Sequence, residues 1–258
     1  MLKVNNIYNG DTIDYMKKID DKSIQLILTS PPYNASWRKD NHRYKNTGFS
    51  DNMSEEEYIE WSVDIFNEYS RILKDTGVVV YNLSYTIKSA HLPTYVVAEI
   101  MKQTDFILVD IVSWKKNSVI PLPMSPNRLT RIVELVYIFA KKDKVINFEC
   151  NKRLAKKSIK GQQYYDVYFN YIETRNNDGG TKKSKHNATF SVDFTKFFID
   201  LYSFENSIVL DNFIGTGTTA IGCLELNRKY IGIDRYSGYC DYAIKRINNY
   251  QKTGNYTL

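Results

Sequence analysis

Cysteine and histidine are scarce in this chain of 258 residues, with three of each. The cysteines (Cys150, Cys223 and Cys240) are odd in number and far apart, and no Cys or His pair has the spacing of a zinc site. We therefore expect reduced thiols and no bound metal. Long apolar runs are missing too. None reaches the roughly 18 residues of a membrane-spanning helix, and the N-terminus lacks the apolar core of a signal peptide, so the expectation is a cytoplasmic protein without a membrane segment.

Excess charge is modest and concentrated in one segment. The chain carries +6 at pH 7. Residues 141–185 contain 12 Lys and Arg against 5 Asp and Glu, so this segment alone accounts for +7 and the rest carries −1. Tyrosines and phenylalanines lie between the basic residues, a mixture that can bind a polyanion and stack on bases. A solvated basic surface loop is the alternative interpretation.

Apolar runs alternate with segments of helical period along most of the chain. Continuous apolar runs predict strands at 4–8, 24–28, 78–83, 106–114, 135–140, 208–211 and 230–233. Helical spacing predicts helices at 12–19, 92–101, 192–202, 218–226 and 239–250. A further helix of about five turns should start at a capping box of Ser54 and Glu57 and end at Asp75-Thr76-Gly77. This order is typical of an α/β protein with a doubly wound, mostly parallel sheet.

One predicted strand ends in an unusual way. Thr29-Ser30-Pro31-Pro32-Tyr33-Asn34 follows directly on the apolar run 24–28. The prolines stop the strand and stiffen the turn, which brings a hydroxyl, a carbonyl and an aromatic ring to the strand's carboxyl end. This segment is either a plain strand terminus or a candidate active site.

A second motif near the C-terminus joins a predicted strand to a predicted helix, and it reads DNFIGTGTT from Asp211 to Thr219. Glycines in such a loop permit positive φ and close approach of a ligand. Asp234 ends the next strand, 23 residues after Asp211, where a carboxylate accepts hydrogen bonds from ribose hydroxyls. The chain has neither a complete G-x-G-x-x-G motif nor a Walker lysine here, so S-adenosylmethionine fits better than NAD or ATP.

The two motifs together resemble those of the DNA methyltransferases that modify exocyclic amino groups. The catalytic motif precedes the cofactor motif, with a variable region between them, which resembles the permuted β class of this family. Weaker counterparts of further family motifs occur in the same order (Asn9-Gly10-Asp11, residues 73–77, residues 127–131 with Glu134, and residues 186–190). The resemblance implies a circularly permuted, Rossmann-like methyltransferase fold. Residues 1–140 would form its catalytic half, 141–190 a target-recognition insertion, and 191–258 the cofactor-binding half.

The resemblance also implies a role for individual residues. The catalytic turn would comprise Ser30, Pro31, Pro32 and Tyr33, with the Ser30 hydroxyl and the Pro31 carbonyl orienting the target amine and Tyr33 stacking on the flipped base. Cofactor contacts would come from Asp11, Phe190, Asp211, Phe213, Gly215, Gly217, Thr218 and Asp234. For Asp11 the alternative is an N-cap, and for Phe190 a core aromatic. DNA contacts would come from Arg38, Lys39, Arg128, Lys152, Arg153, Lys156 and Lys157. The polar loop 36–52 is a candidate to close over the flipped base, or else a plain surface loop.

The predicted function is site-specific methylation of double-stranded DNA. Ser30 leads the catalytic motif as in many cytosine-N4 enzymes of the family, so cytosine N4 is favoured and adenine N6 is the alternative. Asn212 replaces the family's usual proline, and we expect it to alter the stiffness of the loop more than its contacts. A protein glutamine methyltransferase and a catalytically inactive DNA-binding module are the competing functions. The resemblance also allows for a cognate restriction endonuclease and for a homodimer.

Overall fold

The structure, a computed structural model, describes residues 2–34, 53–85, 89–117, 129–156, 160–176, 178 and 190–257. Within these ranges the elements follow in the order β1 (Asn6–Asn9), α1 (Thr12–Met16), β2 (Ile24–Thr29), α2 (Glu55–Ile72), β3 (Leu73–Leu83), α3 (Leu92–Gln103), β4 (Phe106–Lys116), β5 (Val133–Lys141), η1 (Lys142–Lys144), β6 (Tyr171–Thr174), α4 (Val192–Tyr202), β7 (Ile208–Asp211), α5 (Thr218–Glu225), β8 (Lys229–Asp234) and α6 (Ser237–Thr253).

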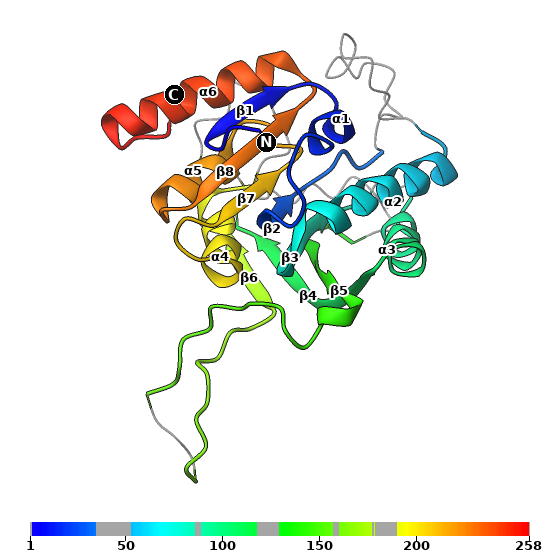
Figure 1. The fold of residues 1–258 in the computed structure, drawn as a ribbon, viewed down its shortest axis with the longest axis vertical. Coiled ribbons are helices and arrows are strands. Elements are labelled where there is room, and N and C mark those ends of the chain that lie inside the picture. The colour runs from blue at the N-terminus through cyan, green and yellow to red at the C-terminus, as the bar shows by residue number, and fades with distance from the viewer. Residues whose placement is uncertain are drawn as a thin grey trace.

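The strands form one sheet at the centre of the molecule, in the order β1-β8-β7-β2-β3-β5-β4-β6 (Figure 1). Neighbouring strands are parallel except at β5, which runs antiparallel to both β3 and β4. The carboxyl ends of all the other strands therefore share one edge of the sheet. The predicted doubly wound, mostly parallel sheet is confirmed.

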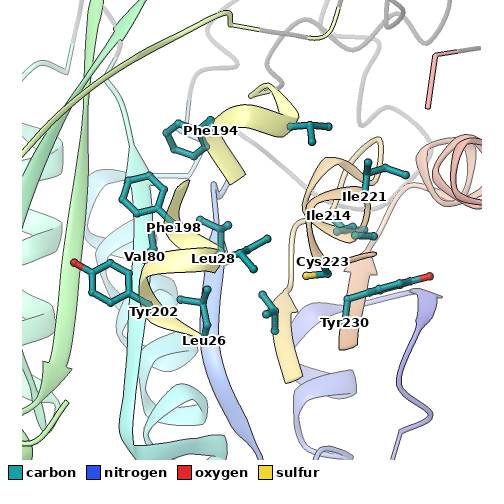
Figure 2. Close-up of a cluster of buried hydrophobic side chains, with 14 of the residues drawn as sticks. Leu26, Leu28, Val80, Phe194, Phe198, Tyr202, Ile214, Ile221, Cys223 and Tyr230 are labelled. Carbon is teal, nitrogen blue, oxygen red and sulfur yellow. The ribbon is translucent and has the colours of Figure 1, made fainter. Parts of the chain in front are cut away.

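Helices cover both faces of this sheet (Figure 1). On one face, Leu26 and Leu28 of β2 belong to the same cluster as Phe198 of α4 and Ile221 of α5 (Figure 2). On the other face, Ile27 belongs to a cluster with residues of α1, α2 and α3. Because successive residues of a strand point to opposite faces, burial on both sides makes each central strand apolar throughout. This is the physical origin of the continuous apolar runs in the sequence.

Helix α2 begins with the predicted capping box. The Glu57 N–H donates to the Ser54 hydroxyl at 3.1 Å, and the Ser54 N–H donates to the Glu57 carboxylate at 2.8 Å. The two bonds satisfy backbone donors that have no partner inside the helix.

The end of α2 differs from the prediction. The helix ends at Ile72 and β3 begins at Leu73, so the expected turn at Asp75-Thr76-Gly77 is wrong. These residues lie where the register between β2 and β3 shifts. Gly77 permits the close approach of the two backbones, because a Cβ there would lie 2.6 Å from the carbonyl oxygen of Gln25. Helix α1 is also shorter than expected, since it ends at Met16.

The segment 141–190 contributes a strand that the sequence did not predict. Strand β6 pairs in parallel with β4, and the indole N–H of Trp114 donates to the Thr174 hydroxyl at 2.9 Å. Before β6, the chain extends away from the sheet and returns (Figure 1). We call its described residues, 151–156 and 160–169, the arm. An antiparallel bridge between Leu154 and Tyr165 joins its two sides.

The three cysteines are free thiols. Among the helices of the described ranges, none combines the length and the apolar character needed to cross a membrane.

Candidate active site and cofactor loop

The two motifs singled out in the sequence meet at the carboxyl edge of the sheet. Strand β2 ends at Thr29 and leads into the catalytic turn, Ser30 to Tyr33, while β7 ends at Asp211 and leads into the cofactor loop, residues 212–217. Strands β2 and β7 are parallel neighbours. The turn and the loop therefore lie side by side, although 182 residues of sequence separate Thr29 from Asp211.

The side chain of Asp211 joins the catalytic turn to the cofactor loop. Its Oδ1 accepts hydrogen bonds from the Thr29 hydroxyl at 2.8 Å and from the Phe213 N–H at 3.1 Å. Its Oδ2 accepts from the Thr219 hydroxyl at 2.5 Å. Burial raises the pKa of Asp211 to about 6, against the opposing effect of these hydrogen bonds. Both oxygens are thus engaged by donors of the protein itself.

Three side chains form a hydrogen-bonded group in the catalytic turn. The Ser30 and Tyr33 hydroxyls lie 2.7 Å apart, and both lie within hydrogen-bond distance of Oδ1 of Asn82, at 3.3 and 3.1 Å, so that one hydroxyl donates to the other and the second donates to Asn82. Asn82 lies near the end of β3, and its amide donates to the Leu135 carbonyl at 3.3 Å, which orients the side chain. Burial, followed by the charge of Glu134, raises the pKa of Tyr33 well above its ordinary value. The phenol is therefore neutral at physiological pH.

Helix α2 holds the catalytic turn from the other side. The Tyr58 hydroxyl donates to the Pro32 carbonyl at 2.7 Å. Asn34, just after the turn, bonds both backbone groups of Met53, with Nδ2 donating to the carbonyl at 2.9 Å and Oδ1 accepting from the N–H at 2.8 Å. The two chain ends that flank residues 35–52 thus lie together beside the turn. The loop 36–52 itself, with Arg38 and Lys39, lies outside the described residues.

The backbone of the cofactor loop requires its glycines. Gly215 has φ of +51° and Gly217 of +81°, values at which a side chain is strained. A Cβ on Gly217 would also lie 2.9 Å from the Cβ of Ala243 on α6. The loop therefore packs directly against the C-terminal helix.

Asp234 closes the loop from the adjacent strand. Its Oδ2 accepts from the Gly215 N–H at 3.0 Å and its Oδ1 from the Tyr236 N–H at 2.8 Å. Burial raises the pKa of Asp234 to about 6. The hydroxyl of Thr216 is buried and has no hydrogen-bond partner within the described ranges. A buried polar atom without a partner is costly, and a polar ligand in this loop would satisfy it.

The structure also places the remaining predicted cofactor residues. Asp11 is the N-cap of α1, and its Oδ1 accepts from the Ile13 N–H at 2.9 Å, so the N-cap interpretation is confirmed. Phe190 is half-buried and stacks on Phe194, with ring centroids 4.9 Å apart. It packs against the core, as the alternative interpretation held. The Phe213 ring packs against that of Trp61 on α2, with ring centroids 5.6 Å apart. The Thr218 hydroxyl accepts a hydrogen bond from Arg246.

Asn212 makes two buried hydrogen bonds with its side chain. Its side chain is completely buried, its Oδ1 accepts from the Tyr69 hydroxyl at 2.6 Å, and its amide donates to the Thr12 hydroxyl at 2.8 Å. Asn212 therefore connects α1 to α2, and these side-chain contacts were not part of the expectation about the stiffness of the loop.

Three of the seven residues predicted to contact DNA lie within the described ranges. Lys152, Arg153 and Lys156 are exposed on the arm. Exposed aromatic side chains accompany them, with Tyr165 exposed by 61% and Phe169 by 74%. Arg128 and Lys157, like Arg38 and Lys39, lie outside the described residues.

Sequence reasoning missed several residues that shape the site. Asn82 left a signal, because it is the amide in an otherwise apolar run, VVVYNL, at the carboxyl end of a buried strand. Thr29 is the first residue of the motif TSPPYN, but the sequence did not indicate its bond to Asp211. Tyr58 and Arg246 left no signal, since their partners are backbone carbonyls and loop atoms far away in the sequence.

Comparisons with known proteins identify the family. The chain matches the N6/N4 methyltransferase family model, described as DNA methylase, over residues 24–245. It is 32% identical to the orphan methyltransferase M.BamHII of Bacillus amyloliquefaciens over 265 residues, which cover 91% of this chain and 92% of that relative. It is 27% identical to the type II methyltransferase M2.MboI of Moraxella bovis, over 94% of this chain and 87% of the relative.

Solved structures show the same fold. The PvuII DNA methyltransferase (cytosine-N4-specific) aligns with a TM-score of 0.73 at 21% identity, over 92% of this chain and 84% of that one. The complex of M1.HpyAVI with S-adenosylmethionine aligns with a TM-score of 0.59 at 21% identity, over 93% and 98%.

The chain therefore belongs to the N6/N4 family of DNA methylases, and the resemblance seen in the sequence is confirmed. It is a DNA amino-methyltransferase of the kind found among type II modification enzymes, a family that depends on S-adenosylmethionine.

Proposed function

We propose that this chain transfers a methyl group to the exocyclic amine of a base flipped out of double-stranded DNA, with N4 of cytosine as the target and N6 of adenine as the alternative. The observation that carries the proposal is the hydrogen-bonded group of Ser30, Tyr33 and Asn82, which Thr29 and Asp211 connect to the cofactor loop.

The amine must be activated by its hydrogen-bond partners. Its lone pair is delocalised into the ring, so the free amine is a poor nucleophile. Acceptors on the two N–H bonds can rotate the amine until its lone pair points out of the ring plane. Because the Ser30 hydroxyl donates its hydrogen to Asn82 or Tyr33, its lone pairs are left to accept one N–H. The Pro31 carbonyl would accept the other.

Tyr33 would provide the surface on which the flipped base rests. Its hydroxyl is fixed by Ser30 and Asn82, which holds the ring in one orientation. Stacking on a fixed ring offsets part of the few kcal/mol that extrusion of a base costs. The raised pKa keeps this ring uncharged, so no phenolate disturbs the amine.

The cofactor would be held by the loop 213–217 and by Asp234. When bound, S-adenosylmethionine supplies a methyl group on a positively charged sulfur. Asp234 would accept from the ribose hydroxyls, and its bonds to the N–H groups of Gly215 and Tyr236 fix it for this task. Thr216 would use its unpartnered hydroxyl on the same ligand.

The methylated base decides between the two targets. The protein is expressed in a bacterial host that lacks its own DNA methyltransferases, and the DNA is digested to nucleosides and separated by mass. We expect N4-methylcytosine. N6-methyladenine would establish the alternative, and no methylated nucleoside, despite binding of S-adenosylmethionine, would contradict the enzymatic function.

The catalytic turn is tested with a matched pair of variants. Ser30→Ala should lower the single-turnover rate at least about a hundredfold while the cofactor dissociation constant stays unchanged. Ser23→Ala, directly before β2 and therefore beyond its opposite end, should leave both quantities unchanged. An equal loss of cofactor affinity in Ser30→Ala would contradict the division between turn and loop.

We also propose that the arm within residues 141–190 contacts DNA phosphates, since its basic side chains are exposed and accompanied by exposed aromatics. Lys152→Ala with Arg153→Ala should weaken binding of duplex DNA and reduce the slope of log K against log salt by about 2. The control, Lys245→Ala with Lys252→Ala on α6, lies far from the arm and should leave the slope unchanged (Figure 1). Equal slopes in the two double variants would refute this role.

Two predictions about partners rest on the family resemblance alone. A cognate restriction endonuclease is expected for a type II enzyme such as M2.MboI, whereas M.BamHII is named an orphan. A homodimer likewise stays a prediction, which sedimentation velocity would test.

A further inference from the structure

Arg246 of α6 is a buried cation that donates hydrogen bonds to the cofactor loop and to the first residue of α5. The residue is 1% exposed. One terminal nitrogen, Nη1, donates to the Thr218 hydroxyl at 2.9 Å and to the Thr216 carbonyl at 3.3 Å. Its Nε donates to the Tyr256 carbonyl at 3.0 Å. Arg246 lies one turn after Ala243, the residue against which Gly217 packs, so one face of α6 contacts the end of the loop at Thr216 and Gly217.

The same guanidinium also forms an ion pair with a carboxylate that follows β6 in the chain. Nη2 of Arg246 lies 2.5 Å from Oδ2 of Asp178, whose side chain is 9% exposed. Oδ1 of Asp178 accepts from the Val192 N–H at 2.9 Å, at the start of α4. A buried charge is retained in a protein only when it is paired, and here the pair spans two parts of the chain with different tasks. Asp178 belongs to the segment 141–190, Thr216 belongs to the cofactor loop, and Thr218 begins α5 directly after that loop.

We infer that Arg246 is a positioning residue that couples the segment 141–190 to the cofactor site. A movement of the chain after β6 displaces the carboxylate of Asp178, the guanidinium follows its partner, and the loop at Thr216 to Thr218 follows the guanidinium. The coupling is reciprocal, because any link between two sites acts equally in both directions. Cofactor in the loop therefore orders Asp178 and residues 171–176 of β6 and its end, and a ligand on that segment alters the affinity for cofactor.

The identity of that ligand as DNA rests on the proposed function, whereas the link itself does not. The test therefore uses S-adenosylmethionine alone, without DNA and without turnover. Asp178→Asn keeps the size of the side chain and an acceptor for Val192, but removes the charge that orients Arg246. The control is Glu225→Gln, which breaks the ion pair of 2.6 Å between Lys196 and Glu225 that joins α4 to α5.

Two quantities are measured for each protein. By calorimetry, Asp178→Asn should raise the cofactor dissociation constant at least about fivefold, the lower end of typical coupling factors, while Glu225→Gln stays at the wild-type value. By hydrogen exchange, cofactor should slow exchange in peptides covering residues 171–178 in the wild type and in Glu225→Gln, and not in Asp178→Asn.

A second variant keeps the test decisive if Asp178→Asn fails to fold. Arg246→Lys preserves the ion pair with Asp178 but cannot reach Thr216 and Thr218 at the same time, so it should weaken cofactor binding with the fold intact. Wild-type affinity in Arg246→Lys, or cofactor-dependent protection of residues 171–178 that survives in either variant, overturns the inference. Loss of DNA methylation in the wild type would contradict the proposed function and leave these two measurements unaffected.

Discussion

Acidification from pH 7 to pH 5 should weaken the binding of S-adenosylmethionine, and Asp234 is the main reason. Burial raises the pKa of this carboxyl to about 6 in the protein without cofactor. The ionised carboxylate is the better acceptor for ribose hydroxyls, and the ligand carries a positive sulfur. Binding therefore favours the ionised form, lowers the pKa and releases a proton wherever the group was still protonated. By linkage, affinity is complete above the raised pKa and decreases as the pH falls through about 6.

The size of the effect follows from the fraction of ionised Asp234. A group with a pKa of about 6 is roughly nine-tenths ionised at pH 7 and one-tenth at pH 5, so the dissociation constant should rise about tenfold. Asp211, whose pKa burial also raises to about 6, adds up to a further factor of about ten if its charge is needed to shape the loop.

Calorimetry at pH 7, 6 and 5 and constant ionic strength measures this dependence. The α-amino and α-carboxyl groups of the ligand, with pKa values of about 7.7–8.0 and 3.3–3.7, change little over that range. Asp234→Asn should bind S-adenosylmethionine more weakly at pH 7. Its dissociation constant should also lack the increase of about tenfold between pH 7 and pH 5 that Asp234 causes in the wild type. A wild-type dissociation constant that changes less than about threefold, or an undiminished dependence in Asp234→Asn, would refute the reasoning.

Three further outcomes are expected. Asn82→Ala should reduce the single-turnover rate about tenfold or more, because Ser30 and Tyr33 lose their common acceptor, while calorimetry shows unchanged cofactor affinity; an unchanged rate would contradict this. Tyr69→Phe removes the buried bond to Asn212 and should lower the free energy of unfolding in urea by about 1–2 kcal/mol; no change would mean that Asn212 finds another donor. Gly217→Ala should lower the free energy of unfolding by at least about 1 kcal/mol, since φ at this position is +81° and the new methyl group would clash with Ala243. It should weaken cofactor binding as well, and wild-type stability together with wild-type affinity would refute the packing argument.

The sequence was informative where local patterns determine the structure. The capping box of Ser54 and Glu57 and the buried runs of β2 and β7 depend on neighbouring residues alone, and all were predicted. Strand β6 was missed because its four residues, YIET, carry too few apolar positions to show a period. The register shift at Gly77 was missed because it depends on the backbone of Gln25, far away in the chain.

The site was predictable in its motifs and not in its internal contacts. The resemblance to a family placed the catalytic turn beside the cofactor loop, whereas periodicity does not reveal that β2 and β7 are neighbours. The side-chain partners had no signal, since the bond between Thr29 and Asp211 and the link from Asp178 to Arg246 join residues remote in sequence. Asn212 is the reverse case, because the family's usual proline at this position indicates a change in the backbone and gives no sign of the hydrogen bonds that the Asn212 amide makes.

The strand order has a consequence for how the chain folds during synthesis. Strand β1 is the first to be made, and its neighbour in the sheet is β8, which is nearly the last. Strand β2 pairs on one side with β3 but must wait for β7 on the other. Pairings between such distant segments form slowly, and unpaired apolar strands are prone to aggregate in the meantime. On the ribosome, the part of the chain before α4 should therefore remain an open intermediate until β7 and β8 emerge.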